Sequence, residues 1–379
     1  MQNPDTLEIF RKYFPYLQSG KIYFNHASIS PLSTEVTDRV EDYLKMRSVT
    51  DIENYEQVMQ TTAAVKENIA SLVHTTPDRI AFVDNTSNGL NILAQGIQWK
   101  NGDRIILNDI EFPSNVYPFM NLRSQGVEVD FVKSKDGVVS AEDIISSITP
   151  KTRLVSISYV QFLSGYRADL AMIGDYCSRN NIIFCVDGIQ GVGALQLDVH
   201  ACHIDFLACG TQKWMMGLMG LAFVYISDRL QETLQPKYVG WMSVENTWEL
   251  LNYDFVLKKT ADAFQNGSFS VIGVAGLSGA LSLFEQAGHK YIEEKILANT
   301  AYFTEQLTGL GYKLPAASFP DKHRSGIVSF KTDKAKLIFT ELKKEDIVCS
   351  LREGMIRFSP HFYNTREEID RVTDIIKKI

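Results

Sequence analysis

The fold is decided by two stretches of sequence, VDGIQGVG at residues 186–193 and ACGTQKWMMGLMG at residues 208–220. Each stretch follows or ends an apolar run that is typical of a buried strand, and each then continues with small and polar residues. Asp187 ends the first run, and Lys213 follows the second, 26 residues further along the chain. If the two strands are parallel neighbours, both side chains reach the edge of the sheet at which α/β proteins bind ligands.

Two interpretations of this pair compete. Alone, Asp187 would more often cap a helix, and Lys213 would more often lie on the surface. Together the two residues suggest a different chemistry, because lysine forms Schiff bases with aldehydes and a neighbouring acid keeps the nitrogen of a pyridine cofactor protonated. A carboxylate at the end of a buried strand also costs free energy unless it has such a partner.

The rest of the chain predicts two domains. Six apolar runs predict strands, at residues 80–84, 104–109, 152–160, 182–188, 205–211 and 220–227. Helical patterns separate these runs, which indicates a mainly parallel sheet covered on both faces. After residue 271 the pattern changes to a long helical stretch at 274–311 and three short strands at 327–330, 347–351 and 355–360. We therefore expect a large domain over 1–271, whose N-terminal segment packs on the other domain, and a small α+β domain over 272–379.

Composition narrows the function. The chain has 379 residues, 45% of them hydrophobic, and a formal net charge of −7, which argues against nucleic-acid binding. No apolar run approaches the ~20 residues that span a bilayer, and the N-terminus lacks a signal-peptide pattern. The five cysteines form no CxxC pair and suit reduced thiols better than disulfides or a zinc site. We expect a cytoplasmic protein without a metal site that binds neither membranes nor nucleic acid.

Two further motifs follow predicted strands. Residues 85–89, NTSNG, lie between a strand and a helix, where hydroxyls and backbone N–H groups can bind a phosphate, although such sequences are also common helix caps. Residues 111–115, EFPSN, place the aromatic ring of Phe112 after another strand. Both motifs would lie at the same edge of the sheet as Lys213.

At this point the sequence resembles the class V aminotransferase family of fold-type I pyridoxal-5′-phosphate (PLP) enzymes. The two opening stretches look like its cofactor core, and its other landmarks follow in order: YFNHASISPLS (23–33), NTSNGLNILA (85–94), EFPSN (111–115) and RFSPHFYNTREEIDRV (357–372). The family includes cysteine desulfurases, kynureninase and isopenicillin N epimerase. The resemblance implies an α/β fold with a mainly parallel seven-stranded sheet and a smaller C-terminal α+β domain.

The resemblance also assigns residues. It implies a Schiff base on Lys213, with Asp187 at the pyridine nitrogen and Gln190 at the phenolic oxygen. Phosphate ligands would come from Thr86, Ser87 and, as a third donor, Thr211, and across the interface of a homodimer from Asn266, Gly267 and Ser268. Phe112 would stack on the ring. Gly210 and Gln212 depart from the Ser and His that relatives often have.

Arg357 matches the arginine that binds the substrate carboxylate in this family. Its planar fork suits bidentate carboxylate binding, although an arginine in this strand could equally face solvent or form an ion pair. Further candidates for the substrate pocket are His26, Gln161, Trp241 and His361, each equally open to a structural role. The role of Arg352 stays open.

The predicted function is an aminotransferase that acts on a small amino acid. The alternatives are an isopenicillin-N-epimerase-like enzyme, a C–S lyase and a non-catalytic protein that keeps the fold. A nicotinamide-dependent dehydrogenase is disfavoured because no GxGxxG follows the first strands. A cysteine desulfurase is also disfavoured, because the family's desulfurases carry a nucleophilic cysteine near the substrate arginine. Here no cysteine lies between Leu351 and the C-terminus, and Cys349 would be packed inside a strand.

Overall fold

The computed structural model describes residues 4–379 and contains a central sheet of seven strands. Its strand order is β2-β8-β7-β6-β5-β3-β4. The strands are β2 (Ile80–Val83), β3 (Arg104–Asn108), β4 (Glu128–Val132), β5 (Thr152–Ser158), β6 (Ile183–Asp187), β7 (Phe206–Gly210) and β8 (Ala222–Ile226). Strand β8 is antiparallel to both neighbours, and the other pairs are parallel. The predicted mainly parallel seven-stranded sheet is therefore confirmed.

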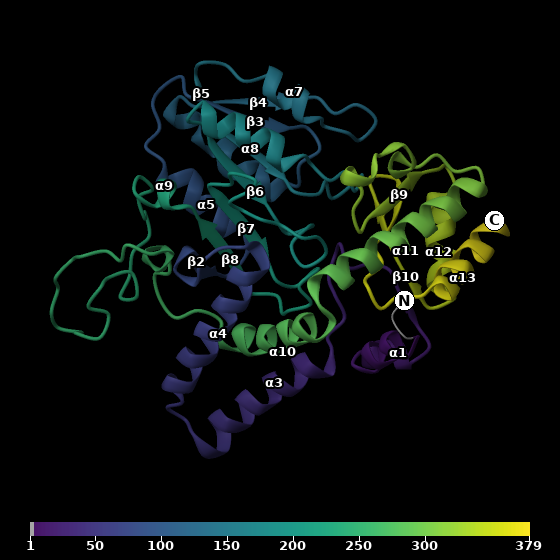
Figure 1. Ribbon diagram of the computed structural model, residues 1–379, viewed down its shortest axis with the longest axis horizontal. Coiled ribbons are helices and arrows are strands. Elements are labelled where there is room, and N and C mark those ends of the chain that lie inside the picture. The colour runs from purple at the N-terminus through teal and green to yellow at the C-terminus, as the bar shows by residue number, and fades with distance from the viewer. Residues whose placement is uncertain (1–3) are drawn as a thin grey trace.

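Some helices surround this sheet, and others belong to a second, smaller part of the molecule (Figure 1). They are α1 (Pro4–Lys12), α2 (Pro15–Gln18), α3 (Thr34–Lys45), α4 (Tyr55–Val73), α5 (Thr86–Gly96), α6 (Tyr117–Met120), α7 (Ala141–Ser146), α8 (Leu170–Arg179), α9 (Asp228–Gln231), α10 (Val271–Ala287), α11 (His289–Gly309), α12 (Ala335–Lys344) and α13 (Arg366–Lys377).

Both faces of the sheet are covered, which explains why its inner strands are apolar at nearly every position. In β6, Phe184 and Val186 face the core cluster that also contains residues of α4, α7, α8 and α10. Cys185, between them, faces the opposite cluster with α5 and α6. This alternation leaves the ends of the strands as the places where polar side chains can meet.

The smaller part contains a three-stranded antiparallel sheet, order β11-β12-β9. These strands are β9 (Val328–Lys331), β11 (Ser350–Arg352) and β12 (Met355–Phe358), and α11 to α13 pack around them. The N-terminal segment joins this part, because β1 (Ile22–Tyr23) pairs in parallel with β10 (Ile347–Val348). Figure 1 shows this part beside the larger sheet.

Two details differ from the sequence-based expectations. The helical stretch 274–311 is two helices, because the chain bends by 84° between α10 and α11, at Gly288 with φ +80°. The run 347–351 is not one strand: its first half pairs with β1 and its second half with β12, and buried Cys349 lies between them. No single described helix is long and apolar enough to cross a membrane, and only the bent pair α10–α11 meets that test by length and composition.

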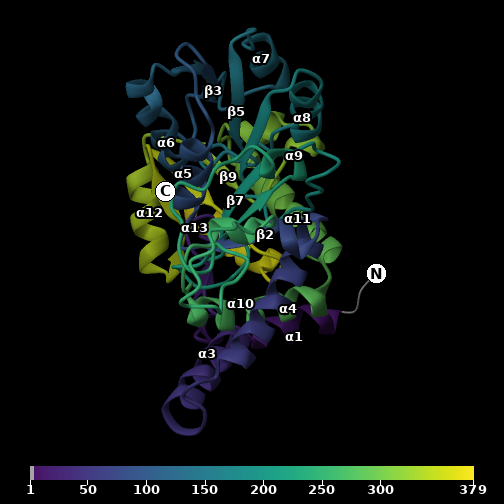
Figure 2. The ribbon, with the colours of Figure 1, turned by 90° about the vertical axis from the view of Figure 1, so that its left-hand side faces the viewer.

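Helices α3 and α4 project away from both parts. The turn that joins them includes a π-helical segment at Met46–Thr50, and the two views show the pair extending as a long arm (Figures 1 and 2). Helix α10 packs along this arm and connects it to the smaller part. The division of the chain at residue 271 remains a prediction.

Candidate active site

Polar side chains gather where the parallel strands of the large sheet end. Asp187 ends β6, and Lys213 follows β7 within three residues. Strand β2 has the same direction as β7, because both are antiparallel to β8. The start of α5, with Thr86, therefore lies at this same edge, as the sequence predicted for the ends of parallel strands.

Asp187 lies at the bottom of the site with one oxygen unsatisfied. It is buried, and its Oδ1 accepts a hydrogen bond from the backbone N–H of Ile189 at 3.1 Å. Its Oδ2 is buried and has no partner among the described residues. Burial raises the pKa of Asp187 to about 6, and the nearby charge of Glu111 adds to this rise. An unpaired buried carboxylate oxygen is costly, so the site is suited to a cationic N–H such as a protonated pyridine nitrogen.

Lys213 is partly buried beside this carboxylate. Burial lowers the pKa of its amine to about 8, against the opposing effect of Asp187. Its Nζ lies 5.6 Å from the ring centroid of Phe112, and this ring is 42% exposed. A lysine with a lowered pKa thus lies beside both an acid and a half-exposed ring, a set of groups that fits a flat aromatic aldehyde.

Hydrogen bonds from an N-terminal and a C-terminal segment fix the backbone around Lys213. Ser30 donates from its N–H to the Gln212 carbonyl at 2.9 Å and from its hydroxyl to the Lys213 carbonyl. His361 donates from Nε2 to the Trp214 carbonyl at 3.2 Å. A Cβ added at Gly326 would lie 2.3 Å from the Trp214 ring, so this tryptophan packs directly against the smaller part.

The start of α5 offers a place for a phosphate. The Asn85 side chain caps the helix by accepting from the N–H of Asn88 at 2.8 Å. Thr86 Oγ1 is buried and has no partner among the described residues. A Cβ at Gly210 would lie 3.2 Å from that oxygen, so the helix start is next to the lysine loop. The hydroxyl of Ser87 donates to Ser114 at 2.8 Å.

Two of the predicted cofactor ligands have partners inside the protein. Gln190 donates to the Ala27 carbonyl and accepts from Trp214 Nε1, both at 2.9 Å. The hydroxyl of Thr211 lies 3.0 Å from the carbonyl oxygens of both Leu218 and Leu221. Gln190 keeps one amide hydrogen for a further bond, whereas the single hydroxyl hydrogen of Thr211 is used within its own loop.

The segment Asn266, Gly267 and Ser268 lies apart from Lys213. It lines a groove of about 850 Å³ together with Asp84 and Asn88, on the outer side of the α5 start. Ser268 also lines a second groove of about 660 Å³, with Trp241. Within one chain these residues border the surface, and their role at a neighbouring subunit stays a prediction.

Arg357 provides a second polar centre. Its side chain is 2% exposed and belongs to β12. The guanidinium donates to the Phe162 carbonyl at 2.7 Å, to the Ser28 hydroxyl at 2.8 Å and to the Ser350 hydroxyl at 3.2 Å. Burial lowers the pKa of Arg357 to about 10. Neither of the alternatives from the sequence applies, because Arg357 neither faces solvent nor forms an ion pair with any described carboxylate.

The other candidate pocket residues divide into three groups. His26 and His361 are fully buried in an aromatic cluster with Trp214 and Tyr363, and His26 binds the Ser359 carbonyl through Nδ1 at 2.9 Å. Gln161 is buried, and its Oε1 has no described partner. Trp241 and Arg352 lie at the surface. The two imidazoles therefore pack inside the protein, and the Oε1 atom of Gln161 is free to accept a hydrogen bond.

Sequence reasoning missed Glu111 as an individual residue. Its buried carboxylate accepts from Asn108 at 2.6 Å, Asn115 at 3.1 Å, Gln161 at 2.9 Å, and both the N–H (2.8 Å) and hydroxyl of Ser158. The signal was present, because Glu111 follows β3 as Asp187 ends β6, and an acid just past a buried strand needs partners.

Fold and site together define a PLP-dependent enzyme of fold type I. The family model "Aminotransferase class-V" matches residues 22–372, and the chain belongs to this family. An uncharacterized aminotransferase of Bacillus subtilis, YcbU, is 28% identical over 97% of both chains. A probable cysteine desulfurase of Methanothermobacter thermautotrophicus is 27% identical over 98% of both chains.

A solved structure has the same fold. It is a complex between the cystine C-S lyase C-DES and its reaction product cysteine persulfide, with a TM-score of 0.87, 25% identity, and coverage of 97% of this chain and 99% of that one. The comparisons confirm the resemblance, the fold class and the PLP cofactor. They also give cysteine desulfuration more support than the sequence motifs did.

Proposed function

We propose that this enzyme transforms a small α-amino acid by proton transfer at Cα, as an aminotransferase, with Lys213 as the residue that moves the proton. One observation carries the proposal: the buried guanidinium of Arg357 has no described carboxylate partner. It lies near Lys213, because it donates to the carbonyl of Phe162, whose ring packs against Phe112 beside the Lys213 amine. A buried unpaired cation is costly unless a ligand supplies the anion. The α-carboxylate of an amino acid would do so.

The residues fit PLP, and each would have a distinct task. When bound, PLP withdraws electrons from Cα of the substrate. Asp187 would hold the proton on the pyridine nitrogen, since its free Oδ2 accepts one hydrogen bond. Lys213, whose pKa burial lowers to about 8, loses its proton near neutral pH more readily than an ordinary lysine, and its neutral amine can accept a proton. Thr86 and the start of α5 would bind the phosphate.

Cysteine desulfuration is the second candidate, because curated relatives bear that name. The thiols of this chain do not favour it. Burial raises the pKa of Cys349 to about 12, that of Cys177 to about 12 and that of Cys202 to about 11. Burial also raises the pKa values of Cys185 and Cys209. A protonated thiol is a poor nucleophile, so a C–S lyase that uses no cysteine is the better sulfur-directed alternative.

Product analysis separates these reactions. The holoenzyme is incubated with ¹⁵N-labelled amino acids, including cysteine and cystine, with and without a 2-oxo acid. An aminotransferase moves ¹⁵N to the acceptor, and an epimerase gives the D-isomer. A desulfurase gives alanine from cysteine and leaves the sulfur as a persulfide, which an added thiol reductant releases as sulfide; a lyase gives pyruvate and ammonia without any acceptor. Product formation that does not depend on the 2-oxo acid would contradict the aminotransferase proposal.

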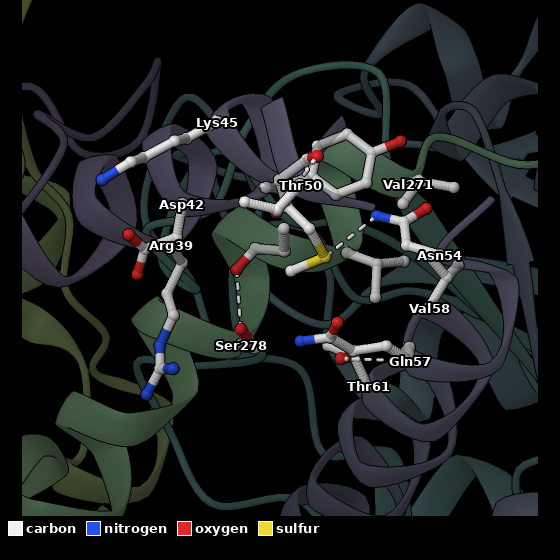
Figure 3. A pocket seen from close by; sticks show the side chains of 14 residues that line it. Arg39, Asp42, Lys45, Thr50, Asn54, Gln57, Val58, Thr61, Val271 and Ser278 are labelled. Atoms are coloured by element: carbon white, nitrogen blue, oxygen red, sulfur yellow. Dashed lines mark hydrogen bonds between the residues drawn. The ribbon is translucent and has the colours of Figure 1, made fainter. Parts of the chain in front are cut away.

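We further propose that the enzyme is a homodimer. Large apolar side chains are exposed on the turn between α3 and α4 and on the loop before α10. They are Val49 (74%), Ile52 (66%), Trp248 (61%), Leu251 (86%), Tyr253 (86%) and Phe255 (66%). The pocket in Figure 3 lies between α3, α4 and α10 and shares Asn54 and Val58 with the groove that contains Ser268.

A second copy of the chain is the occupant that this surface suits best. Exposed apolar patches of this size usually mark an interface, and this one continues to the segment Asn266–Ser268, which the family resemblance places at the neighbour's phosphate. The five free cysteines suit a reducing compartment, and we place the dimer in the cytoplasm.

A further inference from the structure

A second arginine lies on the same face of the β11–β12 hairpin as Arg357. In the register of these strands, Ser350 is opposite Arg357 and Arg352 is opposite Met355. Side chains two residues apart on a strand share a face, and the hydrogen bond from Arg357 to Ser350 fixes which face that is. Arg352 therefore projects on the side of Arg357, roughly 7 Å further along the strand.

The charge of Arg352 is uncompensated. Its side chain is exposed, and it forms no ion pair with any carboxylate among the side chains that the structure describes, residues 7–379. The neighbouring Glu353 occupies the turn, with φ +47°, and makes no ion pair with a described residue. Arg352 is therefore free to bind an anion from solution.

Arg352 also lies near the reacting groups. Burial is the main reason why the pKa of Arg357 falls, and the charge of Arg352 adds to it. The same holds for Lys213, where burial acts first and the two arginines add to the lowering against Asp187. Both guanidinium groups thus lie on one face of the β11–β12 hairpin, and the charge of each acts on the Lys213 amine.

The nearby acids do not neutralise this charge. Asp187 lies at the bottom of the site, opposite the expected position of the pyridine nitrogen. Glu111 is buried and is surrounded by neutral donors from Asn108, Asn115, Ser158 and Gln161. A ligand with two anionic groups would satisfy both arginines at once, because each guanidinium prefers its own carboxylate.

We propose that Arg352 binds a second anionic group of the substrate, so that the enzyme prefers amino acids with an acidic side chain over neutral ones. This inference rests on the proposed function, in which Arg357 binds the α-carboxylate. Arg352 is thus a specificity-determining residue, and the hairpin that carries it takes the place in the sequence where a desulfurase would have its nucleophilic cysteine.

The test compares two five-carbon acids that differ by one carboxylate, glutarate and pentanoate. Each is titrated into the PLP-loaded enzyme by calorimetry, which needs no turnover. We expect glutarate to bind at least roughly tenfold more tightly than pentanoate, the gain of one charge-assisted contact. Arg352→Gln should remove this preference without changing the affinity for pentanoate, and Arg352→Lys should keep part of it.

A matched control is Arg153→Gln. Arg153 is also exposed, but it lies near the start of β5, at the far end of that strand from the site. It should leave both affinities unchanged. Equal affinities of wild-type enzyme for the two acids, no binding of either acid, or an unchanged glutarate preference in Arg352→Gln would each overturn the proposal.

The design separates this inference from the function on which it rests. Arg357→Gln should weaken both acids, because each would lose the carboxylate contact of the proposed function. If pentanoate binds equally well with and without Arg357, the proposed function fails at the carboxylate site. If Arg357→Gln weakens both acids while Arg352→Gln changes neither, only the proposal on the acidic side chain fails.

Discussion

At the scale of single residues, burial moves the pKa values of Lys213 and Asp187 toward each other. Desolvation disfavours the charged form of each group, so the pKa of the amine falls to about 8 and that of the carboxyl rises to about 6. Such opposed shifts in one site are typical of groups that exchange protons in catalysis. The strand-end positions of both residues were readable from the sequence because buried strands are nearly continuous apolar runs.

Asp187→Asn tests the partner of the pyridine nitrogen. The variant should fold and bind PLP, because the amide is nearly isosteric and the phosphate and lysine contacts remain. Turnover should fall by about 10²-fold or more, since a neutral amide cannot hold a proton on the ring. Steady-state kinetics at matched PLP occupancy provide the measurement, and unchanged kcat would remove Asp187 from the mechanism.

Arg357→Ala tests the carboxylate site. A charge-assisted hydrogen bond contributes about 1.5–3 kcal/mol, so kcat/KM for amino acids should fall roughly tenfold to a hundredfold. A decarboxylated amine of the same side chain serves as control and should be little affected. If the amino acid and the amine lose equally, Arg357 maintains the fold and does not bind the carboxylate.

The residues that sequence reasoning placed less well are those whose partners come from distant segments. Gln190 is bound between Ala27 and Trp214, and Thr211 binds carbonyls of its own loop. His26 and His361 lie more than 300 residues apart in sequence, yet their rings are 5.0 Å apart. No local pattern reports such contacts, because they arise only when the two ends of the chain close over the lysine loop.

At the scale of elements, the apolar strands were predictable, the edge strand β2 among them, and the polar edge strand β4 was not. Strand β4 was missed because it is an edge strand with polar residues, among them Glu128 and Asp130, which pair with Arg104. Such charges protect sheet edges and remove the apolar signal. The run 347–351 was read as one strand because local sequence cannot show that its halves pair with different partners.

Gly326→Ala tests how closely the smaller part packs on the lysine loop. The new Cβ would lie 2.3 Å from the Trp214 ring, and overpacking of this kind costs about 1–3 kcal/mol. We expect a lower melting temperature and weaker PLP binding. Gly309→Ala is the matched control: a Cβ there meets nothing within 4 Å, so it should be neutral or slightly stabilising. Equal effects of the two variants would contradict the packing argument.

The pair of buried imidazoles predicts sensitivity to acid. Burial lowers the pKa of His361 to about 4, from 6.5, and lowers that of His26 well below 6.5. Between pH 6.5 and 4 the unfolded chain binds protons that the folded chain does not, so stability falls as the pH drops, by about 1.4 kcal/mol per unit for one such group.

His361→Gln keeps a donor for the Trp214 carbonyl and removes the titrating group. Thermal unfolding at pH 7.5 and pH 5 should therefore show a smaller loss of melting temperature for the variant than for the wild type. The difference between the two slopes isolates His361 from the carboxyl groups, which titrate in both proteins. Identical slopes would show that this imidazole does not titrate on unfolding.

At the scale of the whole molecule, the proposed dimer would place a second chain on the apolar surface at the end of the arm α3–α4 and on the loop before α10. The family resemblance suggested a dimer, but the extent of the exposed surface could not be read from sequence, because Leu251 and Tyr253 look like ordinary core residues. Their exposure depends on the position of the loop before α10.

A complementation experiment tests the shared site. Lys213→Ala and Ser268→Asp subunits are each expected to be inactive, the second because a carboxylate repels the phosphate. If Ser268 acts on the neighbour's cofactor, a mixed dimer contains one intact site, and an equal mixture after subunit exchange should recover about a quarter of wild-type activity. No recovery despite heterodimers in mass spectrometry, or a fully active monomer in sedimentation, would contradict the shared site.

The central claim, a PLP enzyme built on Lys213, is tested most directly by borohydride reduction of the purified holoenzyme followed by peptide mass spectrometry. Reduction fixes the cofactor to the lysine that carries it. We expect a visible absorption band that disappears on reduction. The label should lie on the peptide that contains Lys213 and not on that of Lys66, which is paired with Asp262. A label on any other lysine, or undiminished labelling of Lys213→Ala, would contradict it.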